Sequence, residues 1–577
     1  LTDVDAPVTQ LNGSLIVRQD LPVEADLRGQ WLGGALEVQI TPDDRTDRNA
    51  TLVARGRATA EELAKYVPAS VKLDGALDWS MTTHLTSRPG SRAQTFAIDS
   101  STQGLGIDLP YPAGKPREAV RPFHVDLEHS ARQLLTRVSF GDIRALLRWI
   151  PERGKWAFDR GSVRADRVAA SLPDHAGLRL EGSIDRLRLD DWFALAENRE
   201  GADTGDGDGG TKLSDVLRAA NLHVDLLQLY GYEWPDVRGV MQATPQGWRV
   251  DVTGSNAEGQ ILIPEDFKGA QPLTIDLERL MVMRTPRNGG ESSQEQSRDP
   301  REWPSLRVHI GDMHLESHPI GGVELHATRV PDGLRIDSLT IVQDAVQAEA
   351  HGDWLIGPQG ERSSLTAKIT STDVRATLRA LNYTEFLEAK RAEVSANLSW
   401  PGGFDGSLIK RASGSITVSA ESGQLLMLQP GAGRMLGLFS VAALPRRLAL
   451  DFSDLTDKGL SFDTIHGDFE LRDGNAYTNN LLLRGPAAEI GVAGRTGLSS
   501  QDFDQTAVVT GNLGASIPVA GAIAGGPAVG AALLLFSQMF KEPLKGIARG
   551  YYRITGTWDD PVVERVDASE AKESRVN

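Results

Sequence analysis

The chain has 577 residues, no cysteine and a formal net charge of −17, with 59 glycines and 29 prolines spread along it. An acidic chain is a poor partner for nucleic acid, whose phosphates require a basic surface, and for anionic lipid headgroups. Without cysteine, zinc–thiolate, thiol-nucleophile and iron–sulfur sites are excluded. A chain free of thiols is compatible with an oxidising envelope compartment.

The N-terminal residues follow a strand-like pattern from the start, with apolar side chains at Leu11, Leu15 and Val17. The sequence contains no signal peptide or apolar span before this pattern. We therefore interpret it as a fragment that lacks its natural N-terminus.

Alternation of apolar and polar residues with period two recurs along most of the chain. Clear examples are residues 123–127, 178–180, 273–277, 323–327 and 416–420. Each segment has one apolar and one polar face, which is typical of an antiparallel sheet that is wet on one side. The pattern predicts a mainly β fold, an elongated and twisted antiparallel β-groove of repeated amphipathic strands.

Short helices are predicted between these strands at residues 59–67, 190–195 and 373–381. Thr59 and Asp373 are suitable as N-caps or first-turn residues of the first and third helix. A strand, one or two helical turns and another strand therefore form a recurring theme.

A second recurring theme is a turn that ends in glycine and opens a strand, at Gly247, Gly333 and Gly474. In the last two copies another glycine follows, Gly352 at 19 residues after Gly333 and Gly494 at 20 residues after Gly474. This spacing predicts a repeated unit of turn, strand, short link and strand.

One hairpin can be registered from the sequence, with a two-residue turn at 311–312. This turn would pair Ile310 with Met313 and Val308 with Leu315, and it would place all four apolar side chains on one face. The consistency of that face supports the predicted turn.

Two segments without periodicity, 197–211 and 284–302, are predicted to be mobile loops. We divide the chain into a repeated β-groove segment at 1–422, a C-terminal region at 423–566 and a disordered tail at 567–577.

The stretch Gly205–Gly210 formally matches the nucleotide-binding pattern G-x-G-x-x-G. It follows a predicted helix rather than a strand, and Asp206 and Asp208 would repel a pyrophosphate. With Asp203 these aspartates also suggest calcium, but the glutamate that closes an EF-type loop is missing. A solvated acidic loop is the better interpretation.

The histidines give no better sign of chemistry. His309, His314 and His326 lie on predicted outer faces, where two imidazoles would need further ligands to hold a metal. The sequence has no H-E-x-x-H pair, G-x-S-x-G turn or Walker loop. We therefore predict a protein that is not an enzyme, without catalytic residues, cofactor or metal.

The region 517–540 is almost wholly apolar, and no charged residue occurs between Asp504 and Lys541. Its length would span a bilayer, but Pro518 and the run 525–527 (Gly-Gly-Pro) break it into two short helices. Two interpretations follow from the residues alone: a buried helical plug at the end of the sheet, or an interfacial hairpin that touches a membrane.

Residues 423–440, 444–455 and 458–469 carry a specific resemblance. Together with 517–540 and 552–561 they resemble the C-terminal AsmA-like region of the YhdP family. The middle of the chain resembles this family only in the style of its strands.

The resemblance implies a periplasmic protein of the Gram-negative envelope, anchored in the inner membrane by an N-terminal helix missing here. The family is similar in architecture to TamB and the chorein-type bridges, in which phospholipid acyl chains slide along an apolar groove between the inner and outer membranes. The expected function is therefore bridge-like phospholipid transport. The alternative is a structural or biogenesis factor for outer-membrane assembly and barrier integrity that carries no lipid. An enzyme, for instance one that acts on a glycan, is the third class, but no catalytic constellation supports it.

Two sets of site residues follow from these expectations. In the C-terminal apolar region we expect membrane contact by Leu533, Leu534, Phe536, Met539 and Phe540, with Lys541 and Lys545 near headgroups. For the lining of the lipid groove we expect Leu178, Leu180, Val308, Leu315, Leu325, Leu334, Ile336, Ile416, Val418, Ile490 and Val492.

Overall fold

A computed structural model of the chain confirms the mainly β fold. Strands account for 71% and helices for 7% of the structure, and the sheet is open and twisted. The residues that the structure describes are 7–17, 23–43, 49–68, 71–86, 94–200, 216–229, 231–283, 299–316, 318–381, 383–404, 408–426, 459–511 and 547–566.

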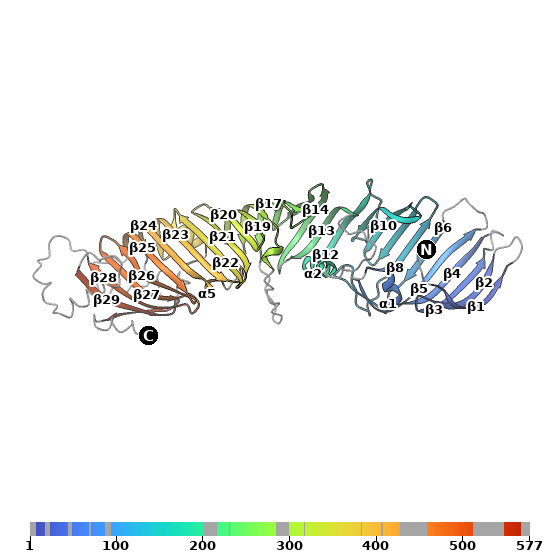
Figure 1. Ribbon diagram of the computed structural model, residues 1–577, viewed down its shortest axis with the longest axis horizontal. Coiled ribbons are helices and arrows are strands. Elements are labelled where there is room, and N and C mark those ends of the chain that lie inside the picture. The colour runs from blue at the N-terminus through green and yellow to red at the C-terminus, as the bar shows by residue number, and fades with distance from the viewer. Residues whose placement is uncertain are drawn as a thin grey trace, which may run out of the picture. The chain divides into compact units, whose positions relative to one another are not determined.

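The described chain divides into two compact units. The first comprises residues 1–262 and 282–287, and the second comprises 263–281 and 288–577. Figure 1 labels many of the elements of both. Up to the division the strands are β1 (Thr9–Ile16), β2 (Glu24–Trp31), β3 (Gly34–Pro42), β4 (Asn49–Thr59), β5 (Lys72–Thr86), β6 (Gln94–Ser100), β7 (Leu105–Asp108), β8 (Phe123–His129), β9 (Leu134–Phe140), β10 (Ile143–Glu152), β11 (Lys155–Arg164), β12 (Gly177–Arg188), β13 (Leu217–Leu229), β14 (Tyr232–Thr244), β15 (Gly247–Gly254) and β16 (Ala257–Pro264).

In the second unit the strands are equally regular. They are β17 (Leu273–Val282), β18 (Leu306–Leu315), β19 (His318–Val330), β20 (Gly333–Gln343), β21 (Val346–Gly357), β22 (Gly360–Ser371), β23 (Leu387–Pro401), β24 (Ser413–Leu425), β25 (Leu460–Arg472), β26 (Asn475–Arg484), β27 (Ala488–Gly497), β28 (Asp502–Gly511), β29 (Ile547–Gly556) and β30 (Pro561–Val566). From β18 to β30, the registered neighbours in this unit are antiparallel.

The first unit departs from the predicted antiparallel order at one place. β11 pairs with β12, and β12 with β13, in parallel. Parallel neighbours need a long crossover that returns the chain to the same end of the sheet. The connection after β12 begins with α2 (Leu189–Glu200), and the one before β12 spans residues 165–176. Period-two alternation does not distinguish parallel from antiparallel pairing, so the parallel pairing of β12 with its two neighbours was not predicted.

The three predicted helices are present. They correspond to α1 (Ala60–Leu63) followed by the 3-10 turn η1 (Ala64–Tyr66), to α2, and to α4 (Val374–Ala380). The Asp373 side chain caps α4 by accepting a hydrogen bond of 3.0 Å from the Ala376 backbone N–H, whereas Thr59 occupies the N-cap of α1 without a side-chain bond. The other helices whose bounds the structure describes are η2 (Pro300–Glu302) and α5 (Leu408–Arg411).

The two segments predicted as mobile loops each overlap a helix at one end. Residues 197–200 belong to α2, and residues 300–302 form η2, where Asp299 accepts a hydrogen bond of 2.9 Å from the Arg301 N–H. Acidic side chains suit both the first turn and the N-cap of a helix, which a reading of polarity alone misses. Residues 201–211 and 284–298 lie outside the described residues.

The predicted glycine repeat is present as a duplicated four-strand motif. β19 to β22 and β25 to β28 begin at positions a constant 142 residues apart, so that Gly333 corresponds to Asn475 and Gly352 to Gly494. Both copies carry an irregularity in the same place, between Ile336 and Leu339 in one and between Thr478 and Leu481 in the other. From the first to the third strand the duplication therefore extends to the pairing of individual residues. Between the third and fourth strands the register differs by two residues, since Gly352 pairs with Leu365 and Gly494 with Gln505.

The hairpin predicted at 311–312 is wrong. β18 continues through these residues to Leu315, and its partner β19 pairs Ile310 with Val323 and Leu315 with His318. Two register irregularities near Met313 accommodate the continuation. A bulge of this kind lets one strand absorb extra residues, which an alternation argument reads as a turn.

The predicted domain boundary at 422/423 falls inside β24, whose residues pair with β23 and β25 on both sides of it. The C-terminal tail at 567–577 and the apolar region at 517–540, with its predicted helical hairpin, lie outside the described residues.

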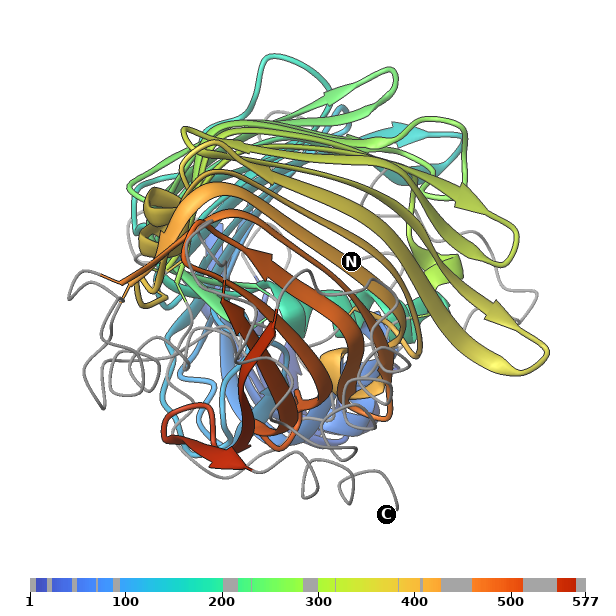
Figure 2. The same ribbon diagram turned by 90° about the vertical axis from the view of Figure 1, so that its left-hand side faces the viewer.

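In the second unit the strands are strongly curved, which is plain in the yellow and orange ribbons of Figure 2. Apolar side chains from β23 to β29 form one buried cluster, among them Val418, Phe469, Ile490 and Tyr552. The apolar face of these strands is therefore buried at this end of the unit.

Candidate functional site

One unbroken row of apolar side chains crosses the sheet of the first unit. Each member pairs directly with the next across thirteen strands, from β2 to β6 and from β8 to β15. We call it row A. Its members are Leu27, Val38, Ala54, Met81, Ile98, Val125, Val138, Ala145, Val163, Leu180, Ala220, Met241 and Val250.

Two further rows cross the second unit. They run side by side from β18, and their members again pair directly from strand to strand. Row B is Ile310, Val323, Ile341, Ala348, Ile369, Val394 and Val418. Row C is Val308, Leu325, Leu339, Ala350, Ala367, Ala396, Ile416 and Phe469.

The face opposite row A is charged. Arg28 approaches Glu37 at 3.7 Å on neighbouring strands, and the His124 ring lies 2.7 Å from Asp99. The hydrogen bond with Asp99 raises the pKa of His124. Such partly exposed cross-strand pairs contribute little to stability, and they keep this face in water. The sheet therefore presents one polar and one apolar surface.

The apolar rows are incompletely covered. Members of row A are buried or half-buried, and in row B the side chain of Ile369 is 40% exposed. The described helices pack near particular strands: α1 against β4 and β5, α2 against β13, η2 against β20 and β21, and α4 and α5 against β23. An apolar sheet face left partly open is unusual in a soluble protein and marks a binding surface.

Comparisons with known proteins show the family of this chain. The sequence model of one family, described as YhdP protein, matches residues 1–563. This chain belongs to the YhdP family. It is 23% identical over 588 residues to the intermembrane phospholipid transporter YhdP of Escherichia coli (strain K12), an alignment that covers 99% of this chain and 45% of the relative. The chain thus spans less than half the length of that relative, and no solved structure matches it.

The resemblance seen from residue 423 onward in the sequence therefore extends, as YhdP-family membership, over nearly the whole chain. Most residues expected to line the groove of this YhdP-family chain lie in the rows or beside them. Leu180 belongs to row A, Val418 to row B, and Val308, Leu325 and Ile416 to row C. Leu178 and Ile336 lie next to the rows, since Leu178 is two residues before Leu180 in β12 and Ile336 pairs with Ala327 and Gly352.

Four of the expected residues lie elsewhere. Leu334, near the start of β20, is 6% exposed and pairs with Arg329 and Trp354. Ile490 and Val492 have no exposed surface and belong to the buried cluster of the second unit. Leu315, chosen from the incorrect hairpin, lies at the end of β18, apart from row C.

The sequence reasoning missed most of row A, of which it named only Leu180. The apolar–polar alternation that marks these strands is present in the sequence. Val125 lies in the alternating segment 123–127, and Ile98, Val138 and Val250 alternate with polar neighbours in the same way. What alternation lacks is the register, which decides whether apolar residues on successive strands meet in one line.

No described group suggests metal or redox chemistry. His309 faces Glu324 at 3.6 Å and His314 faces Asp312 at 3.4 Å, as surface pairs. Among the described residues there is no cluster of three or more histidine, aspartate or glutamate side chains that could hold a metal. The acidic stretch 205–210 lies outside this part of the chain.

The membrane contacts expected in the YhdP-family chain at Leu533, Leu534, Phe536, Met539 and Phe540 also lie outside the described residues. Within the residues that the structure places, none of the helices has the length and apolar character needed to cross a bilayer.

Proposed function

We propose that this chain binds phospholipid acyl chains along its apolar face and carries them between the inner and outer membranes of a Gram-negative envelope. The observation that carries the proposal is row A, in which thirteen successive paired strands each contribute an apolar side chain. The relative in Escherichia coli, an intermembrane phospholipid transporter by its description, supports the choice of cargo.

The dimensions suit acyl chains. Neighbouring strands lie about 4.8 Å apart, so thirteen strands extend row A over roughly 60 Å. The hydrocarbon core of a bilayer is about 30 Å thick for two leaflets, or about 15 Å for each acyl chain. Row A is therefore about four acyl chains long.

A continuous apolar surface also removes the main barrier to moving lipid through water. Exposure of each methylene to water costs about 0.8 kcal/mol, so an acyl chain without cover is strongly disfavoured. Along rows whose members meet at every strand, a chain can shift by one strand without losing its contact. Transport of this kind needs no catalytic group.

The finer parts of the proposal concern the membranes. We place the protein in the periplasm, tethered to the inner membrane through an N-terminal helix outside this sequence, with its C-terminal end toward the outer membrane. The apolar region at 517–540 supports the second contact, and liposome flotation of the full chain with Phe536→Asp and Phe540→Asp tests it. Unchanged flotation of that double variant would remove the contact.

The transport proposal is tested by one charge in row A. Met241→Glu places a carboxylate in the row on β14, and we expect it to reduce co-purifying phospholipid and the transfer of fluorescent phosphatidylethanolamine between vesicles. The control is Gln242→Glu, which lies next in the strand on the opposite face, where the Gln242 side chain accepts a hydrogen bond of 2.8 Å from Arg249.

Lipid content is also what distinguishes transport from a purely structural role. If Met241→Glu folds normally and still carries and transfers as much lipid as the wild type, row A is not the lipid track. Wild-type protein that carries no phospholipid would favour the biogenesis factor.

A further inference from the structure

The duplicated motif places different side chains at equivalent points of the apolar face. In the first copy β21 contributes Ala348 and Ala350, whereas β27 of the second copy contributes Ile490 and Val492 at the corresponding positions. The register is the same in both, because Ala348 pairs with Ile341 as Ile490 pairs with Leu483. Two alanines have thus been exchanged for two large β-branched residues.

The two copies differ in exposure as well. Ile341 is half-buried, and the next strand but one carries Ile369 with 40% of its surface exposed. In the second copy Leu483 is 1% exposed, and Ile490 and Val492 have no exposed surface. The apolar face is open in the first copy and closed in the second.

Side chains of the protein itself fill the second copy. Phe469 of β25 and Leu481 of β26 are each 1% exposed, and Tyr552 and Ile554 of β29 are fully buried in the same cluster. Protein interiors are packed as densely as organic crystals, so such a cluster leaves no path for an acyl chain. Val394 of β23, the preceding member of row B, is partly buried and packs against this cluster, and Val418 of β24, at 1% exposure, is the first member of row B that is buried within it.

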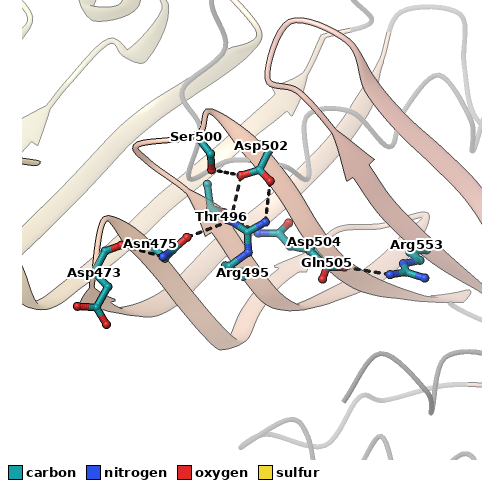
Figure 3. Close-up of polar contacts among 9 residues, drawn as sticks. All are labelled: Asp473, Asn475, Arg495, Thr496, Ser500, Asp502, Asp504, Gln505 and Arg553. Atoms are coloured by element: carbon teal, nitrogen blue, oxygen red, sulfur yellow. Dashed lines mark hydrogen bonds and ion pairs between the residues drawn. The ribbon is translucent and has the colours of Figure 1, made fainter. Parts of the chain in front are cut away.

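The polar contacts differ between the two copies, and Figure 3 shows those of the second. In the first copy Trp354 of β21 donates a hydrogen bond of 2.6 Å to Glu361 of β22. Arg495 of β27 binds Asp502 of β28 through two hydrogen bonds, of 2.9 and 2.7 Å, and donates a third of 3.0 Å to Asn475 of β26. By strand pairing, the corresponding residues of the first copy are Asp353 and Arg362, since Leu355 pairs with Arg362 as Gly497 pairs with Asp502. We call the contacts of Arg495 with Asp502 and Asn475 the clip. They link the three strands β26, β27 and β28 in the copy whose apolar face is closed.

From this contrast we infer that the lipid-binding part of rows B and C ends at β24. We further infer that phospholipid binds to and leaves this unit through the open apolar face of β20 to β23. This inference rests on the proposed function, since it presumes that the rows hold acyl chains. It assigns the exchange site to a stretch of the sheet centred on Ile369, and it excludes Ile490 and Val492 from contact with lipid.

Photo-crosslinking of the full wild-type chain tests the inference without any substitution. The protein is loaded from vesicles of phosphatidylglycerol that carries a diazirine on one acyl chain, irradiated and digested, and the adducts are mapped by mass spectrometry. We expect adducts on residues 333–371, and at least tenfold fewer on residues 475–511, which form the equivalent strands.

Each outcome decides a point. Comparable labelling of 475–511 would show that lipid continues through the second copy and would overturn the inference while leaving transport intact. Labelling of the first unit without residues 333–371 would equally overturn it. If no part of the chain is labelled, the proposed function fails first, and the inference fails with it.

Discussion

Gly352 of β21 lies so close to β22 that a Cβ atom at this position would be 2.1 Å from the backbone carbonyl oxygen of Ser364. Because the oxygen belongs to a paired strand, it cannot move aside without breaking the ladder. Gly352 pairs with Leu365 of β22, and it lies two residues after Ala350 of row C in β21. The glycine is therefore required by the close approach of two strands.

We expect Gly352→Ala to destabilise the second unit by about 1–3 kcal/mol, the usual effect of overpacking. Gly357→Ala in the same strand is the control, because nothing lies within 4 Å of a Cβ there. Urea unfolding followed by tryptophan fluorescence measures both. Equal midpoints for the two variants would mean that β21 and β22 separate more easily than the structure indicates.

The contrast between open and closed parts of the apolar face predicts a contrast in stability. Ile490→Ala removes a fully buried side chain and should lower the free energy of unfolding by about 2–5 kcal/mol through lost burial and a cavity. Ile369→Ala removes one that is 40% exposed, so its cost should be well under half as large. Similar losses measured by chemical denaturation would contradict the closed core.

Much of the fold follows from period-two alternation, as the residues around Val323 and Ile416 illustrate. Both stand in segments predicted as strands, and both lie on the face assigned to them. The parallel pairing of β12 and the continuation of β18 past Ile310 were not predictable in this way. Each depends on a connection or a bulge, and neither changes the alternation of the strand itself.

The sequence predicted an apolar face as the candidate site, but it located only some of the residues that form it. Ile490 and Val492 alternate with their neighbours as Ala348 and Ala350 do, so the sequence treats both pairs as parts of one apolar surface. Whether such a surface is open or filled depends on strands distant in the chain, among them β29 with Tyr552. Local pattern carries no information on that closure.

The clip between Arg495 and Asp502 predicts a defined dependence on pH. The hydrogen bonds from Arg495, with a further one from Ser500, lower the pKa of Asp502. A lowered carboxyl pKa stabilises the fold at pH values above the unfolded pKa of about 3.9, and the contribution is lost as pH falls through the folded value. Because both side chains are partly exposed, the effect is at most about 1 kcal/mol.

Asp502→Asn should therefore lower the thermal unfolding midpoint by a constant amount between pH 5.5 and 8, and the difference from the wild type should shrink below pH 4. Asp504→Asn is the matched control on the same strand, since Asp504 forms its ion pair with Arg553, at 3.4 Å, and acts on Arg495 through its charge alone. A deficit of Asp502→Asn that persists at pH 3 would show that the side chain acts by packing instead of charge.

Because the chain has no cysteine, a single introduced thiol reports directly on which face binds lipid. Ala367→Cys places a thiol in row C, and Thr366→Cys places one at an exposed position next to it on the opposite face of β22. Both substitutions change side-chain volume little, so we expect both variants to fold.

In delipidated protein a water-soluble maleimide should label both thiols. After loading with phosphatidylglycerol, labelling of Ala367→Cys should slow at least tenfold, because the acyl chain covers the thiol, whereas labelling of Thr366→Cys should not change. Equal slowing of both would indicate self-association, and no slowing of either would leave row C without lipid.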